Sequence, residues 1–356
     1  MKVVSMKGLR IKVQRYYPVV AKVASVVCIC LFTITSLMFA GGCGGSTGQL
    51  PVLYGETDWQ RIGLRGEVKS WTLYEVSWTE NFGRIEISSP PAINHSTTFL
   101  ESGDQVESIY YDMNSKPKWK DEFTYDDEGE TWTGCISYKC IDSDYNATSP
   151  QWSYTNLYDN DGRIYRVEGY DYDDAGKKSS RPSWVHLYEY FEDEGKISLS
   201  SYDSNGKLQW KNIDRYNADG MIIESAHYDN DGTIKYSEKF RYDSEGNKIE
   251  WSRYDSDGSL EWTDKFKYDD NGYEVECANY DYRNQLMWTT VYLYINDEEL
   301  ANFDPDSIEN MENLFDTCGN WTVRVTLEEK EGFGGTFRKV KEIEKRVLTY
   351  FSPCSP

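Results

Sequence analysis

A five-residue motif, Tyr-Asp-x-x-Gly, recurs through the second half of the chain. Its steps alternate between 14 and 12 residues, so two copies fill a 26-residue unit. Asp and Asn favour tight turns through their side chains, and Gly accepts a positive φ at no steric cost. The motif therefore predicts an array of β-hairpins. The copies begin at Tyr202, Tyr216, Tyr228, Tyr242, Tyr254 and Tyr268, with a degenerate copy at 280–284.

The segments between the turns alternate in polarity, as strands do. After Gly258, the apolar Leu260, Trp262 and Phe266 share one parity, and Lys265 has the other. Such alternation predicts a strand with one buried and one solvated face. In the shorter of the two steps the parity slips, which indicates a β-bulge. A helix is excluded, because such frequent Gly and Asx residues would break it.

Worn copies of the motif extend the array in both directions. Upstream copies begin at Tyr111, Tyr125, Tyr158, Tyr172 and Phe191, and one follows downstream at Phe315. We expect an all-β fold in which tandem hairpins form one long twisted antiparallel sheet, open or partly rolled. The expected regions are a signal peptide at 1–42, an N-terminal β region at 43–104, the repeat sheet at 105–295, and a C-terminal cap at 296–356 with a short helix at 304–314 and a β-hairpin.

The repeat resembles the YD (tyrosine-aspartate) repeats of the Rhs-like family. The segment Phe315-Asp-Thr-Cys-Gly-Asn-Trp-Thr322, followed by Arg324 and by Glu342-Ile-Glu344, resembles the closing segment of small envelope-associated Rhs-like proteins of Gram-negative bacteria. The segment Gly63-Leu-Arg-Gly-Glu-Val-Lys-Ser70 resembles their first strand, and the similarity covers roughly residues 60 to 350. Large members of the family build a β-shell around a toxin. This chain is much shorter and has no toxin-like tail after the repeats.

The N-terminal segment, 1–42, predicts export from the cytoplasm. It contains six basic residues and no acidic one, and an apolar stretch runs over 23–40. The sequence Ala40-Gly-Gly-Cys43 follows, and it resembles a lipobox with Cys43 as the lipidated residue. An ordinary cleaved signal and an uncleaved anchor are the alternatives. All three place the rest of the chain outside the cytoplasm, as a cell-envelope protein of the outer or inner membrane that faces the periplasm or the exterior.

The chain is strongly acidic. Its net charge is −22, and removal of the basic leader would lower it to −28. This charge argues against nucleic acid as a partner, since phosphate backbones require positive charge. Asp159 and Asp161, like Asp229 and Asp231, resemble part of a calcium-binding loop, but turn chemistry explains the same residues. We expect no metal and no cofactor.

Five cysteines remain after the leader and Cys43. Cys135 and Cys140 are close enough in sequence to bridge a hairpin, so a disulfide between them is possible. The spacing of the cysteines matches no zinc motif. The remaining three are Cys277, Cys318 and Cys354.

Aromatic residues are abundant, with 29 Tyr and 12 Trp. They can be core packing of a thin sheet, or a surface on which sugar rings stack. The candidate binding aromatics are Trp210, Tyr236, Trp251, Trp262 and Trp288.

The sequence contains none of three common catalytic motifs. It has three histidines and no nucleophile elbow, zinc-binding His pair or phosphate-binding loop. We therefore expect no catalytic residues and a non-enzymatic lipoprotein that binds a glycan or an envelope protein and is attached to the membrane by its lipid. One alternative is an accessory of a polymorphic-toxin system, such as an immunity protein or a shell fragment. Another is a hydrolase with an unrecognised pair of carboxylates.

Overall fold

The structure is a computed structural model. It describes residues 64–81, 84–87, 90–126, 131–140, 148–301, 303, 313–332, 335–350 and 352. The signal peptide, Cys43, Cys354 and nearly all of the helix expected at 304–314 lie outside these residues.

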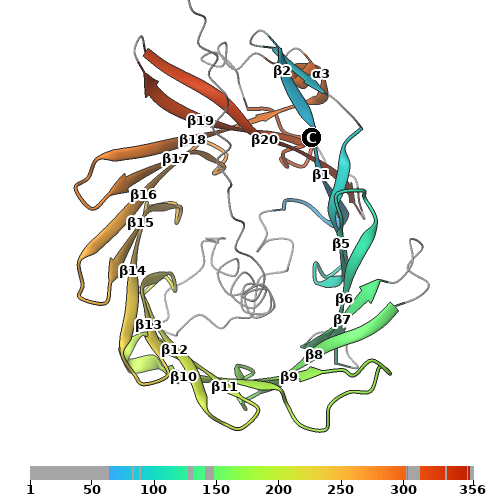
Figure 1. The fold of residues 1–356 in the computed structure, drawn as a ribbon, viewed down its shortest axis with the longest axis vertical. Helices are drawn as coiled ribbons and strands as arrows, with labels where there is room; N and C mark the ends of the chain where they lie inside the picture. The colour runs from blue at the N-terminus through green and yellow to red at the C-terminus, as the bar shows by residue number, and fades with distance from the viewer. Residues whose placement is uncertain are drawn as a thin grey trace, which may run out of the picture. The chain divides into compact units, whose positions relative to one another are not determined.

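Within the described residues, eighteen strands form one antiparallel sheet. Each strand from β4 to β19 pairs with the next one along the chain, and β1 pairs with both β4 and β20. The strands therefore form a closed ring (Figure 1). They are β1 (Val68–Glu75), β4 (Ala92–Phe99), β5 (Gln105–Tyr111), β6 (Pro117–Tyr125), β7 (Trp132–Cys140), β8 (Thr148–Tyr158), β9 (Ile164–Asp171), β10 (Trp184–Phe191), β11 (Lys196–Asp203), β12 (Leu208–Tyr216), β13 (Ile222–Asp229), β14 (Ile234–Tyr242), β15 (Lys248–Asp255), β16 (Leu260–Tyr268), β17 (Glu274–Asp281), β18 (Leu286–Ile295), β19 (Val323–Gly332) and β20 (Gly335–Tyr350).

The sheet is all-β and antiparallel, but the expectation of an open or partly rolled sheet is wrong. Leu73 in β1 pairs with His95 on β4 and with Arg346 on β20, so neither end of the array keeps a free edge. Closure removes the unpaired N–H and C=O groups that an edge strand would present to other chains. Strands from the three expected regions 43–104, 105–295 and 296–356 all join this one barrel.

The turns have the side-chain chemistry that the motif predicts. Asp203 accepts hydrogen bonds at Oδ1 from the backbone N of Asn205 (2.9 Å) and of Lys207 (3.0 Å). Gly206 follows with φ 77°, in the left-handed region. The same pair of bonds is made by Asp112, Asp159, Asp173, Asn217, Asp243, Asp255, Asp269, Asp281 and Asp316.

The bulge predicted for the shorter step is confirmed. Between β14 and β15, Arg241 pairs with Glu250 but Tyr242 pairs with Lys248, so Ile249 is an extra residue. The longer step also contains a bulge, which the sequence did not predict: between β15 and β16, Arg253 pairs with Trp262 but Tyr254 pairs with Leu260. The two bulges of each 26-residue unit together return the chain to the same face of the sheet.

Three tyrosines that lie one repeat unit apart tie the wall together across two strands. The hydroxyls of Tyr242 and Tyr268 donate to the backbone carbonyls of Ile222 and Lys248, both at 2.9 Å and both 20 residues earlier in the chain. Tyr294 makes the equivalent bond to Glu274 at 2.7 Å. Each hydroxyl therefore satisfies a carbonyl next to a bulge, where the ladder of the sheet is interrupted.

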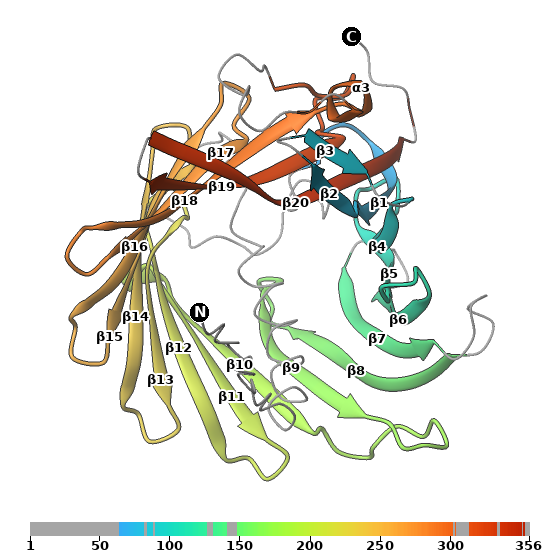
Figure 2. The ribbon, with the colours of Figure 1, turned by 45° about the horizontal axis from the view of Figure 1, so that its top comes forward.

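A small apolar core lies on the outer side of β18–β20. The hairpin of β2 (Trp78–Asn81) and β3 (Arg84–Ile87) and the short helix α3 (Asp297–Ala301) are drawn outside the ring in Figures 1 and 2. The opposite face of these strands therefore points into the barrel. The buried residues of this core are Val76, Ile85, Leu293, Ile295, Leu300, Phe303, Val323, Val325, Leu327, Val340 and Ile343.

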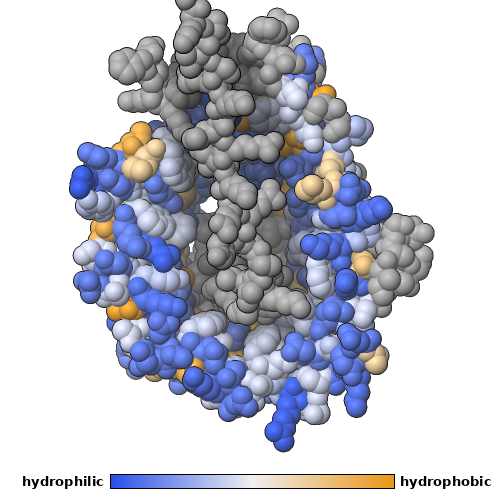
Figure 3. Space-filling view, viewed as in Figure 1, coloured by the Kyte–Doolittle hydropathy of each residue, from blue (hydrophilic) through white to orange (hydrophobic). Residues whose placement is uncertain are grey.

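The outer face of the repeat strands is charged. Lys239 and Arg241 on β14 and Lys265 and Lys267 on β16 are all exposed. Figure 3 shows a mostly hydrophilic surface around the ring. In the described part of the chain, no helix combines the length and the apolar character that crossing a membrane requires.

Candidate ligand-binding face inside the barrel

Directly paired residues of an antiparallel sheet point to the same side, so the inner face can be followed from β20 around the ring. On this face, one aromatic residue recurs at the same place in each successive repeat unit, once on each even-numbered strand from β10 to β18. Strands lie about 4.8 Å apart, so successive members of this series stand about 10 Å apart along the wall. The series is Trp184, Trp210, Tyr236, Trp262 and Trp288. We call it the aromatic series.

The five aromatics singled out in the sequence all lie on the inner face. Four of them belong to the aromatic series, and Trp251 on β15 meets Trp262 edge to face, with ring centroids 4.9 Å apart and an interplanar angle of 78°. All five are half-buried. They are thus neither sealed in a core nor fully open.

Hydrogen-bonding groups lie between these rings. Arg253 stacks its guanidinium over Tyr236 at 3.7 Å, and His227 stacks on the same ring with centroids 4.1 Å apart. On the next pair of strands, Asn279 donates to Asp264 at 2.7 Å. Amide, carboxylate and guanidinium groups beside aromatic faces are suited to a ligand with both apolar faces and many hydroxyls.

A buried polar network links β12, β13 and β14. The hydroxyl of Ser225 donates to Asp214 Oδ1 at 2.6 Å, and His227 Nε2 lies 3.3 Å from both Ser225 Oγ and Glu238 Oε2. Burial raises the pKa of Asp214. Ser225 and Glu238 both contact Nε2 of His227. In a catalytic triad, the serine and the carboxylate contact opposite nitrogens of the histidine ring. The network therefore links neighbouring strands of the barrel wall and does not have the geometry that activates a serine nucleophile.

A second set of titratable groups lies on β15, β16 and β17 and consists of Lys248, Asp264 and Glu274. Lys248 Nζ is 4.8 Å from the ring of Phe266 and 4.9 Å from that of Trp251. Burial lowers the pKa of Lys248 and raises the pKa of Glu274 to about 7. The charges of Lys248 and Asp264 both act on Glu274, so the three groups share one neighbourhood.

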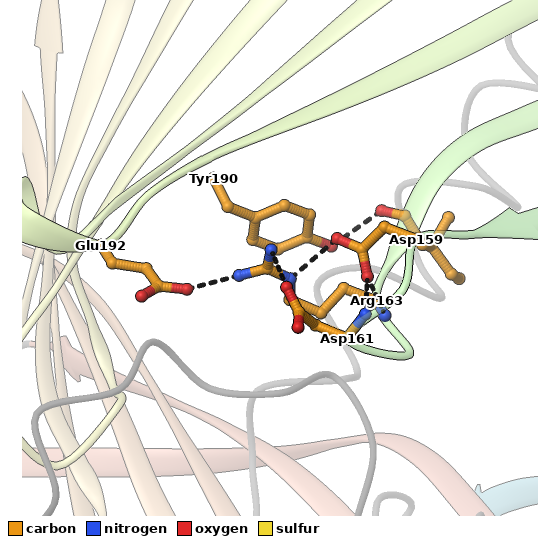
Figure 4. Close-up of polar contacts among 6 residues, drawn as sticks. Asp159, Asp161, Arg163, Tyr190 and Glu192 are labelled. Carbon is orange, nitrogen blue, oxygen red and sulfur yellow. Dashed lines mark hydrogen bonds and ion pairs between the residues drawn. The ribbon is translucent and has the colours of Figure 1, made fainter.

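One turn cluster lies at the rim, and Figure 4 shows it. Arg163 pairs with Asp159 and Asp161 at 3.0 Å and with Glu192 at 2.5 Å, and its guanidinium lies 4.8 Å from the ring of Tyr190. The arginine thus neutralises the two aspartates that resemble part of a calcium loop. Among the described residues, no group of three His, Cys, Asp or Glu side chains is arranged to hold a metal ion.

The structure does not bring Cys135 and Cys140 together. Both lie on the single extended strand β7, which separates their Cα atoms by about 16 Å. Disulfides require Cα atoms within about 7 Å. Cys318 is disulfide-bonded.

Sequence reasoning missed two features of the inner wall. Trp184 completes the aromatic series, and its spacing of one repeat unit from Trp210 was available as a signal. The other is a basic and aromatic group on β1, β19 and β20 that includes Trp71, Arg324 and Arg346. No local pattern marks it, because β1 and β20 are at opposite ends of the chain.

No family model matches this sequence, and no curated protein matches it. Among solved structures, a chain of TcdB2-TccC3 is 11% identical with a TM-score of 0.27, and the match covers 75% of this chain but 19% of that one. A porin-like protein from Bacteroides uniformis is 11% identical with a TM-score of 0.26, over 79% of this chain and 98% of that one. A protein with unknown function from Bacteroides fragilis is 16% identical with a TM-score of 0.20, over 38% and 87% of the two chains. These likenesses concern the chain path alone and bear on no function.

Proposed function

We propose that this protein is a non-enzymatic binding protein of the cell envelope whose inner barrel wall holds an extended glycan. The observation that carries the proposal is the aromatic series, with its half-buried rings at equal steps on one face. A spacing of about 10 Å is close to the length of a disaccharide. A glycan chain could therefore stack one sugar ring in every two on successive aromatics.

The groups between the rings support a glycan over other ligands. Asp264, Asn279 and Arg253 supply acceptors and donors for sugar hydroxyls next to the stacking faces. A nucleic acid also stacks on aromatics, but its phosphates would meet a chain with a net charge of −22.

The proposed location is the cell envelope, with attachment through lipid on Cys43. The basic and apolar leader and the Ala-Gly-Gly-Cys sequence support this location. The disulfide at Cys318 also supports it, because disulfides persist in oxidising compartments. The exposed charges on the outer face suit water rather than lipid. Kinship with the Rhs-like YD-repeat proteins is part of this proposal.

The test is a glycan array followed by calorimetry on the full chain, with and without the double change Trp210→Ala and Trp262→Ala. We expect the double variant to lose at least tenfold in affinity for the glycan that wild type retains, since two stacked rings are removed. The control is Tyr254→Ala with Tyr280→Ala. These tyrosines are also one repeat unit apart and half-buried, but they pair with Ser237 and Thr263 on the outer face.

Equal affinity of both double variants would contradict the proposal, provided that circular dichroism shows each to be folded. No glycan signal, together with capture of one protein from the envelope, would favour the toxin-accessory role instead.

Hydrolysis of the glycan is a second candidate, and Glu274 favours it. A carboxyl with a pKa of about 7 is about half protonated at neutral pH, and the protonated form can donate a proton to a leaving group. Asp264 is the nearby carboxylate for the second role. Release of reducing ends from the bound glycan by wild type, and its loss in Glu274→Gln, would establish this function. Absence of release by wild type would exclude it for that glycan.

A further inference from the structure

Arg346 on β20 points into the barrel and packs against aromatic rings. Two of its side-chain nitrogens donate no hydrogen bond. The guanidinium carbon of Arg346 lies 3.8 Å from the ring centroid of Trp321 and 5.3 Å from that of Trp71. Its Nε and Nη1 atoms are buried and have no hydrogen-bond partner. The indole Nε1 of Trp71 is also buried without a partner.

Three orphaned donors in one place are unusual. Buried polar groups in folded proteins are nearly always hydrogen-bonded, because each lost partner leaves a desolvated dipole or charge. Aromatic faces attract the cation but offer no acceptor to its N–H groups. The site therefore lacks a group that can accept several hydrogen bonds.

The carboxylate nearest in the wall is already engaged by another arginine. Arg324 donates to Glu344 Oε2 from Nε at 2.7 Å and also from Nη2. The positive charge of Arg346 is left without a paired anion among the hydrogen bonds and ion pairs of the described residues. Burial, followed by the nearby charge of Arg324, lowers the pKa of Arg346 to about 10. The side chain still carries its charge at neutral pH.

We propose that Arg346, Trp71 and Trp321 form a binding site for an oxyanion, the carboxylate or phosphate group of a small ligand. Such a group presents two or three acceptor oxygens, and charge-assisted hydrogen bonds to a guanidinium are among the strongest in proteins. The indole N–H of Trp71 gives the anion a further donor. The flanking rings exclude water, which strengthens the electrostatic attraction.

This site is independent of the glycan proposal. It lies on β1 and β20 beside the β18–β19 connection, whereas the aromatic series stands on strands β10 to β18. The site can bind an anion whether or not the aromatic series binds sugar, and either finding can fail alone.

The test is a titration of the full chain with inorganic phosphate, with glucuronate and with glucose, at constant ionic strength. The ¹⁵Nε–¹Hε NMR signal of Arg346 reports directly on its side chain, and calorimetry gives the affinity. We expect a saturable shift of that signal with phosphate or with glucuronate, and none with neutral glucose. The anion that gives the tighter binding identifies the ligand group as phosphate or carboxylate.

The variant Arg346→Gln should weaken binding of the effective anion at least tenfold. Arg241→Gln is the control, since that arginine is exposed on the outer face and pairs with Glu250. If Arg346→Gln does not fold, Arg346→Lys keeps the charge but loses the fixed donors, and should also weaken binding tenfold. An Arg346 signal that is visible and unmoved by both anions would overturn the proposal and leave a purely structural stack.

Discussion

At the scale of single residues, the turns show which positions need glycine and which tolerate a substitute. Gly258 closes its turn with φ 81°, and a Cβ added there would meet nothing within 4 Å. In the degenerate copy, Asn284 occupies the equivalent position with φ 59°. Asn tolerates the left-handed region better than other side chains. The requirement at this position is therefore backbone conformation and not space.

We expect Gly258→Ala to reduce the free energy of unfolding by about 1 kcal/mol, from left-handed strain alone. Gly258→Asn should reduce the free energy of unfolding by clearly less. Urea unfolding of both variants measures the difference. Equal losses in the two variants would show that packing, and not φ, sets the preference.

The buried carboxyl of Glu274 makes stability depend on pH. Its pKa is raised from 4.5 to about 7, so the folded state holds the proton more tightly than the unfolded state. Its stabilising contribution is therefore fully present below about pH 4.5 and is lost as the pH rises through 7.

The variant Glu274→Gln has no such proton to lose. It should match wild type near pH 4.5 and be more stable at pH 8, by on the order of 3 kcal/mol at about 1.4 kcal/mol for each pKa unit. Urea unfolding at the two pH values tests this. A stability difference that is the same at both pH values would show that Glu274 does not titrate in this range.

At the scale of the strand pair, alternate motif tyrosines point to opposite faces of the sheet and make different contacts. Tyr268 points inward and donates to the carbonyl of Lys248, whereas Tyr254 points outward, 5.0 Å below the ammonium of Lys239. The sequence shows both as the same motif. Each step contains one bulge that exchanges the faces, so successive motif tyrosines alternate between the inner and the outer face.

We expect Tyr268→Phe to reduce the free energy of unfolding by about 1 kcal/mol, the net worth of one hydrogen bond next to a buried carbonyl. Tyr254→Phe should cost less than half as much. Thermal or urea unfolding of the two variants measures this. If both cost the same, the inward hydroxyl is not a tie between strands.

The hairpins and the bulge of the shorter step were predictable because they depend on residues within one repeat unit, whereas the bulge of the longer step, which puts Leu260 and Trp262 on opposite faces, was not predicted. Asp203, Asn205 and Gly206 lie in one turn, and their chemistry can be read without the rest of the chain. The sequence predicts that Trp210 and Trp262 share one face of the sheet, but not that this face is the inner one. Which side that face takes depends on the outer core over β18–β20, which the repeat does not encode.

At the scale of the whole molecule, closure depends on contacts between the two ends of the strand array. Leu73 pairs with Arg346 across most of the chain length, and nothing in a periodic sequence indicates how many strands complete a ring. The site at Arg346 arises from the same closure, because Trp71 comes from β1 and Arg346 from β20. An open sheet, as the repeat suggested, would have separated these two residues.

Closure can be tested at β1, which is the one strand that joins the two ends of the array in the described structure. Leu73→Pro removes a backbone donor and cannot fit the ladder of a strand that pairs on both sides. We expect β1 to detach and to expose the edges of β4 and β20, so that the chains associate in a concentration-dependent way. Size-exclusion chromatography with light scattering, compared with wild type, measures this. The control is Thr79→Pro in β2, which pairs only with β3 outside the ring and should leave the assembly state unchanged. A Leu73→Pro variant with wild-type mass and melting temperature would mean that the barrel does not depend on this seam.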